Sequence, residues 1–65
     1  MRPHSLGQGE AIRETDAAVL VMVEDLDEEV WIPKSQIHDD SEVWEDGHVG
    51  EVVVSEWLAG KQGWT

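Results

Sequence analysis

Cysteine is absent from this chain, as are tyrosine and phenylalanine, and only four of its 65 residues are lysine or arginine. The lack of cysteine excludes disulfides and cysteine-ligated zinc sites, and it suits a reducing compartment. No run of residues approaches the ~20 apolar residues that a membrane-spanning helix needs. Residues 1–10 also lack the apolar segment of a secretory signal. We therefore expect a cytoplasmic protein that contacts no membrane.

Signatures of catalysis are missing as well. The sequence contains no nucleophile elbow, no phosphate-binding glycine loop and no HExxH motif. A chain of 65 residues makes at most one small domain, with little room for a pocket of the usual ~300 Å³ or more. We predict that the protein is not an enzyme and that it uses no cofactor.

Negative charge is what the chain has in excess. Residues 24–56 contain twelve carboxylates and a single base, Lys34, so this segment carries a formal charge of −11, equal to that of the whole chain. The acids alternate with valine, tryptophan, isoleucine and leucine, which indicates a folded sheet decorated with charge rather than a disordered acidic tail. Such a surface keeps a protein soluble. It also repels nucleic acid and attracts the proteins that bind nucleic acid.

The domain organisation follows from composition. Residues 1–14 hold Pro3, Gly7 and Gly9 and few apolar side chains, so we expect a flexible N-terminal tail. Residues 15–65 are expected to form the single small domain.

Four segments within that domain have strand character. Ala17–Val23 is an apolar, β-branched run typical of a strand buried on both faces. Residues 28–32 have strand composition, and Pro33 ends that strand. Asp46-Gly47 is a turn dipeptide. The predicted strands are 17–23, 28–32, 41–45 and 49–54.

A short helix is predicted after the last strand. Ser55 is a suitable N-cap, Glu56 lies in the first turn, and Gly63 suits the position that follows the helix. The expected fold class is α+β: a small antiparallel meander of three to four strands with one short C-terminal helix. Because one helix covers only one face of a sheet, either the sheet curls toward a barrel or a second chain covers the other face. A homodimer therefore stays open.

The four tryptophans divide by their neighbours. Trp31 and Trp57 lie beside apolar residues and are expected in the core, since so small a protein must bury most of its large side chains. Trp44 lies among acids and Trp64 near the C-terminus, so these two are the candidate exposed anchors for a partner.

One group of residues has the donor types of a metal site. It consists of His38, Asp39, Asp40 and His48, but the spacing matches no known ligand pattern. A solvated loop is the better interpretation, and no metal is predicted.

Two separated motifs resemble a known group of proteins. Residues 30–37 read VWIPKSQI and residues 54–59 read VSEWLA. Together they resemble a family of small phage and prophage proteins in which a strand ends in WIPKSQI and a closing helix has the form V-x-EWLA. The size and acidity also resemble those of anti-CRISPR proteins, in particular small type I-C inhibitors. Residues 1–14 have no counterpart in this resemblance.

The resemblance implies a phage-derived inhibitor inside a bacterial host cell. Its acidic surface would mimic DNA, bind a host type I CRISPR–Cas effector complex (Cascade) and block DNA binding, without binding nucleic acid itself. The alternative is a small phage accessory protein of unassigned role, either a monomer or a homodimer, that acts through apolar and tryptophan contacts. The predicted partner-binding residues are Glu28, Glu29, Asp39, Asp40, Glu42, Trp44, Glu45 and Asp46.

Overall fold

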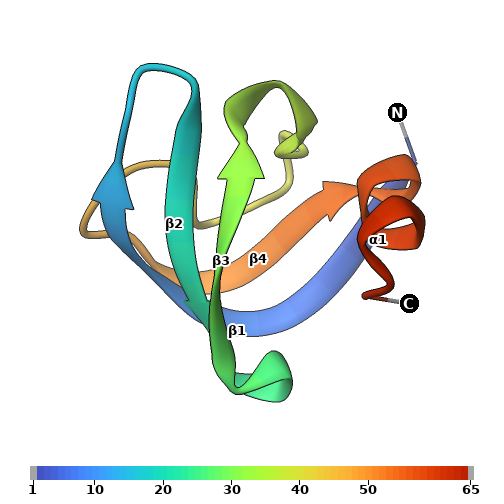
Figure 1. Ribbon diagram of the computed structural model, residues 1–65, viewed down its shortest axis with the longest axis horizontal. Helices are drawn as coiled ribbons and strands as arrows, with labels where there is room; N and C mark the ends of the chain where they lie inside the picture. The colour runs from blue at the N-terminus through green and yellow to red at the C-terminus, as the bar shows by residue number, and fades with distance from the viewer. Residues whose placement is uncertain (1, 65) are drawn as a thin grey trace.

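The computed structural model describes residues 2–64 and contains one four-stranded antiparallel sheet and one C-terminal α-helix, which confirms the predicted α+β class. The order of strands across the sheet is β3-β2-β1-β4 (Figure 1). The strands are β1 (Pro3–Glu14), β2 (Ala18–Val23), β3 (Glu28–Pro33) and β4 (Val49–Ser55). The 3₁₀ turns η1 (Glu24–Leu26) and η2 (Lys34–Gln36) follow β2 and β3, and the helix α1 is Glu56–Gln62.

The N-terminal segment is the largest departure from the prediction. A flexible tail was expected over residues 1–14, but residues 3–14 form β1, which pairs with both β2 and β4 and so lies inside the sheet. Gly9 is part of the reason, because a Cβ atom there would lie 2.7 Å from Val52 Cγ2 and 2.8 Å from the Met22 carbonyl oxygen. A glycine that suggested flexibility thus marks a place where neighbouring strands approach closely. The domain accordingly includes β1, and only strands β1 to β3 form a meander.

Two irregularities bend β1. The register with β4 shifts at Leu6, and the register with β2 shifts at Ile12. Strand β4 pairs with residues 3–10 of β1 and strand β2 with residues 9–14, so each neighbour has one shift in its own part of β1. Such bulges bend a strand and increase its twist. Figure 1 shows β1 sweeping beneath the other strands, so that the sheet curls toward a barrel, the first of the two arrangements considered for its faces.

The segment between η2 and β4 runs along the second edge of β4. The amide of His38 donates to the Val53 carbonyl over 2.9 Å, and the amide of Glu42 donates to the Glu51 carbonyl over 2.9 Å. Ile37 forms an isolated bridge with Val54. The predicted strand 41–45 is therefore wrong, since this stretch is an extended loop held by scattered bonds, although the predicted turn at Asp46-Gly47 is present.

The core is built from small aliphatic side chains. In β2, Val19, Val21 and Val23 are fully buried while Met22 is 38% exposed. The strand therefore buries one face, and the prediction that both of its faces are buried was wrong. Alternation along a strand accounts for the pattern. The buried hydrophobic cluster consists of Leu6, Ala11, Val19, Val21, Val23, Ile32, Val43, Val52, Val54, Leu58 and Ala59.

Helix α1 begins and ends as predicted. The Ser55 hydroxyl oxygen accepts a hydrogen bond from the Leu58 amide, and Gly63 ends the helix in the left-handed conformation. The helix turns Leu58 and Ala59 toward the core, which leaves Trp57 61% exposed. None of the helices in the described part of the chain is both long and apolar enough to cross a membrane.

The burial of the tryptophans corrects three of the four predictions and confirms the fourth. Trp31 is 49% exposed and Trp57 is 61% exposed, so placing them in the core was wrong. Trp64 packs partly buried against the core, so its assignment as an exposed anchor was also wrong. Trp44, 53% exposed, is the anchor candidate that the structure confirms as exposed. Valines fill the interior of this small sheet, which leaves room for only part of one indole.

Candidate functional site

A hollow with a volume of about 410 Å³ opens at one end of the curled sheet. It lies where β1 ends and where the chain leaves β3, and the loop between residues 37 and 48 forms its other wall. This volume exceeds what the length of the chain led us to expect. We call it the Trp44 hollow; its lining residues are Glu14, Lys34, Ile37, His38, Asp39, Trp44 and Glu45.

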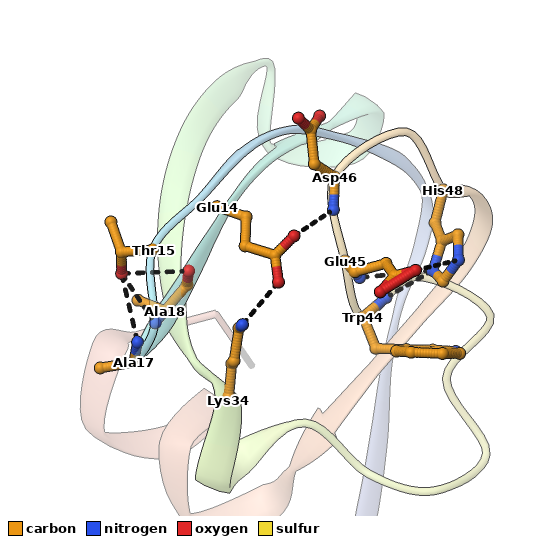
Figure 2. Close-up of polar contacts among 9 residues, drawn as sticks. All are labelled: Glu14, Thr15, Ala17, Ala18, Lys34, Trp44, Glu45, Asp46 and His48. Atoms are coloured by element: carbon orange, nitrogen blue, oxygen red, sulfur yellow. Dashed lines mark hydrogen bonds and ion pairs between the residues drawn. The ribbon is translucent and has the colours of Figure 1, made fainter.

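An ion pair bridges two of the walls. Lys34 Nζ donates to Glu14 Oε2, and Glu14 Oε1 accepts a hydrogen bond of 3.2 Å from the Asp46 amide (Figure 2). The hydrogen bond from Lys34, together with that from the Asp46 amide, holds the pKa of Glu14 below the usual range of a glutamate. The Glu14 carboxylate thus connects β1 to the start of η2 and to the loop of residues 37–48, which we call the acidic loop. It remains ionised near neutral pH.

Trp44 is held by its backbone and by one histidine. The amides of Trp44 and Glu45 both donate to His48 Nδ1, each over 3.3 Å. The Trp44 and His48 rings lie edge to face with centroids 4.5 Å apart, as the close-up in Figure 2 shows. Because Nδ1 accepts these bonds, it carries no proton. The indole is therefore fixed in position while half of its surface stays open to a partner.

Hydrogen bonds from the Ser41 hydroxyl and the Glu42 carboxylate fix the rest of the loop. Ser41 is buried, and its hydroxyl donates to the Val43 carbonyl over 2.9 Å and accepts from the Val53 amide over 3.1 Å. Glu42 Oε1 accepts from the Glu51 amide over 2.8 Å. Glu42 therefore has a structural contact with β4, unlike the other predicted carboxylates of the loop.

The structure separates the predicted partner-binding residues into two groups. Asp39, Trp44 and Glu45 line the hollow, and the backbone of Asp46 contacts its Glu14. Asp40 and Glu42 lie on the same loop with exposed side chains. The second group, Glu28 and Glu29, lies at the start of β3, whereas the hollow is lined by Lys34, which directly follows the end of β3. Six residue steps along the strand, or roughly 20 Å, separate Glu28 from Lys34. The predicted residues do not form one continuous acidic surface.

Sequence reasoning missed four residues of the hollow, which are Glu14, Lys34, Ile37 and His38. Glu14 was placed in the tail, Lys34 was noted only as the single base of the acidic segment, Ile37 only as the end of the VWIPKSQI motif, and His38 only as part of a rejected metal group. Lys34 carried a usable signal, because a single base within an acidic segment is expected to pair with a carboxylate. Its actual partner could not be found without knowing that β1 belongs to the sheet.

The chemistry of the hollow favours a cationic group. Glu14, Asp39 and Glu45 supply three negative charges and Lys34 one positive charge, so the lining has a formal charge of −2 with neutral histidines. Trp44 adds an aromatic surface and Ile37 an aliphatic one. A lysine or arginine side chain combines an apolar stem with a cation, and arginine in particular stacks on indole and pairs with carboxylates.

The histidines and acids of the loop do not converge on one point. Among residues 2–64, no group of three or more histidine, aspartate or glutamate side chains is arranged to hold a metal ion. His38 Nδ1 is engaged by the Asp40 amide over 3.0 Å, much as His48 Nδ1 is engaged by the amides of Trp44 and Glu45. These two imidazoles therefore serve the shape of the loop.

Comparisons with known protein families, with curated proteins and with solved structures find nothing that matches the chain. The resemblance of the WIPKSQI and EWLA segments to phage proteins therefore stays a prediction.

Proposed function

We propose that this protein is an inhibitor that binds a basic, nucleic-acid-binding surface of another protein and keeps nucleic acid from it. The observation that carries the proposal is the Trp44 hollow, in which an exposed, rigidly held indole lies among carboxylates at the edge of an acidic loop. Carboxylates would meet lysine and arginine side chains of the partner, and Trp44 would fix the register of the contact.

The most specific form of the proposal names a type I CRISPR–Cas effector complex as the partner, within the cytoplasm of a bacterial host. That form rests on the resemblance of two motifs to small phage proteins. The physical argument is independent of the name, because any protein groove that tracks a phosphate backbone is lined with lysine and arginine. With four lysine and arginine residues against fifteen acids, the protein itself is expected to bind neither DNA nor RNA.

The proposal predicts which charges matter. Asp39→Lys and Glu45→Lys should each weaken inhibition of effector–DNA binding by about tenfold or more, because each places a like charge against the basic partner. Glu28→Lys is the matched control, since it changes the net charge equally at a position away from the hollow. The measurement is a mobility-shift competition with purified effector complex and target duplex, using circular dichroism to check that each variant is folded.

Two results would contradict the proposal. If Glu28→Lys weakened inhibition as much as Asp39→Lys and Glu45→Lys, overall charge and not the Trp44 hollow would govern binding. If the parent protein left effector–DNA binding unchanged at every concentration, the effector would not be its partner. A gel shift of DNA by the parent protein alone would argue against an inhibitor that mimics DNA.

An accessory protein that acts through apolar contacts is the second candidate. It is favoured by the exposure of Trp31, Trp57 and Met22, which a protein acting only through charge does not need. The salt dependence of association separates the two functions. Association with a basic groove should slow as the screening length falls from ~30 Å at 0.01 M salt to ~8 Å at 0.15 M, while apolar docking should not.

A further inference from the structure

A second surface lies on the outer side of β2 and β3, away from the Trp44 hollow. Leu20 is the register partner of Trp31, and Met22 is the register partner of Glu29. Side chains two apart on a strand share a face, so Leu20, Met22, Glu29 and Trp31 stand together on the side opposite Val19, Val21 and Ile32. We call these four residues the β2–β3 outer face. Trp31 is 49% exposed there and Met22 is 38% exposed.

Carboxylates border the apolar part of this face. Glu29 lies opposite Met22 on β3, and Glu10 lies opposite Met22 on β1. Beside Met22 is a shallow depression of about 130 Å³, which Glu10 and Glu24 line together with Val49. Arg13 is the register partner of Leu20 and adds a positive charge at the β1 side of this face. Apolar and acidic side chains therefore alternate across the outer surface of three strands.

The rest of the described chain leaves this face open. Helix α1 packs mainly against β4 and β1, at the other end of the strand order from β3 (Figure 1). The loop that contains Trp44 follows the far edge of β4. Within residues 2–64, Trp31 and Met22 thus remain exposed large hydrophobic side chains on a regular sheet surface. Adjacent exposed apolar side chains with a polar border are typical of an interaction surface.

Charge decides which occupant fits. A symmetric dimer through this face would bring Glu10, Glu24 and Glu29 of one copy against acidic residues of another, in a chain whose net charge is −11. That arrangement is unfavourable, because the one Arg13 of each copy offsets only one of its three carboxylates. A partner with apolar side chains for Trp31 and Met22 and with lysine or arginine between them satisfies both features at once.

We infer that the β2–β3 outer face binds a basic amphipathic segment of another protein, in which apolar residues alternate with lysine or arginine. Trp31 is the central anchor, because a large, half-exposed indole can lose most of its remaining water contact on binding. Glu10, Glu24 and Glu29 pair with the cations at the border. This surface is distinct from the Trp44 hollow and does not depend on the inhibitory function proposed above.

Two synthetic peptides test the inference. One is a short amphipathic lysine–leucine peptide, and the other has the same length and charge with serine in place of each leucine. At 0.15 M salt the parent protein should bind the leucine peptide about tenfold more tightly or better, as calorimetry measures it. The amide resonances that shift on titration should belong to β2 and β3.

Variants assign the effect to the face. Trp31→Ala should abolish the preference for the leucine peptide and leave the weak binding of the serine peptide unchanged. Trp57→Ala is the matched control, since it removes from α1 an indole that is more exposed than Trp31 and should keep the preference. Met22→Ser provides a second, smaller change on the face and should reduce the preference even if Trp31→Ala fails to fold.

Several outcomes would overturn the inference. These are equal binding of the two peptides, equal effects of Trp31→Ala and Trp57→Ala, and resonance shifts confined to residues around Trp44. Concentration-dependent dimerisation that Trp31→Ala abolishes, seen by sedimentation, would assign the face to a second copy of the chain instead.

Discussion

Gly9 gives the sharpest test of β1 as an inner strand of the sheet. In Gly9→Ala the added methyl group would lie 2.7 Å from Val52 Cγ2 and 2.8 Å from the Met22 carbonyl oxygen. The carbonyl belongs to the backbone of the neighbouring strand, so rotating a side chain cannot relieve the contact. Overpacking of this kind costs about 1–3 kcal/mol, and reduced freedom of the unfolded chain returns about 0.4–1 kcal/mol. We expect Gly9→Ala to lower the free energy of unfolding by about 1–2 kcal/mol.

Gly60 is the matched control for this substitution. It lies in α1, and a Cβ atom there would meet nothing within 4 Å. Gly60→Ala should therefore raise the free energy of unfolding by about 0.5–1 kcal/mol, because alanine is the better helix former. Urea denaturation followed by circular dichroism measures both. With a slope of about 1 kcal/mol per M for so small a domain, the midpoint should fall by about 1–2 M for Gly9→Ala and rise for Gly60→Ala.

The two variants must move in opposite directions. If Gly9→Ala were as stable as the parent protein while Gly60→Ala was stabilised, β1 would not pack against β2 and β4 as described, and residues 3–14 would be the tail that the sequence suggested. Loss of stability in both variants would instead show that Gly60 does not lie on an open face of α1.

The remaining predictions concern the cap of α1, an exposed indole and the ion pair of Glu14 and Lys34. Ser55→Ala should lower the free energy of unfolding by about 1 kcal/mol, measured by urea denaturation, because the Leu58 amide loses its cap. Trp57→Ala should change it by less than about 0.5 kcal/mol, since the indole is exposed. The lowered pKa of Glu14 stabilises the fold above the pKa of an unfolded glutamate, and this contribution disappears as pH falls through the folded pKa. Lys34→Met should raise that pKa in a carboxyl NMR titration; an unchanged value would refute the ion pair.

Strand β2 was predicted from its apolar, β-branched run, whereas turn and cap signals predicted β3, β4 and α1, because each of these three elements is bounded by a residue with a strong local preference. Pro33 closes β3, Asp46-Gly47 precedes β4, and Ser55 and Gly63 bound α1. These preferences act over a few residues and need no knowledge of the fold.

Strand β1 was missed because its bulges interrupt the alternation that identifies a strand. Leu6 and Ile12 are extra residues in the register, so buried and exposed positions change phase within twelve residues. The two-residue alternation of buried and exposed positions is then not visible along the whole strand, and Gly7 and Gly9 suggest a flexible segment instead. The burial of Gly9 depends on strands that follow much later in the chain, which no local pattern contains.

The candidate site was predictable only in part for a related reason. The acidic loop and the exposure of Trp44 follow from composition, because an indole between Glu42, Glu45 and Asp46 has few apolar neighbours in sequence. The wall formed by Glu14 and Lys34 depends on β1 lying in the sheet. Trp31 and Trp57 were misplaced because composition gives the apolarity of a residue but not the face on which an element presents it.

The acidic loop combines a fixed shape with free charge. Most of its bonds to β4 come from backbone groups and from the buried Ser41 hydroxyl, which are neutral, and Glu42 is the carboxylate that contacts β4, through the Glu51 amide. Within residues 2–64, the pair of Glu14 and Lys34 is the single ion pair that involves a lysine or arginine. Asp39 is therefore available to an outside cation without giving up a lysine or arginine, and so is Glu45, whose Oε2 lies 3.7 Å from His48 Nε2. A loop whose geometry relied on internal salt bridges would lose them on binding. This loop can exchange water for a basic partner while keeping its shape, which limits the conformational entropy lost on association.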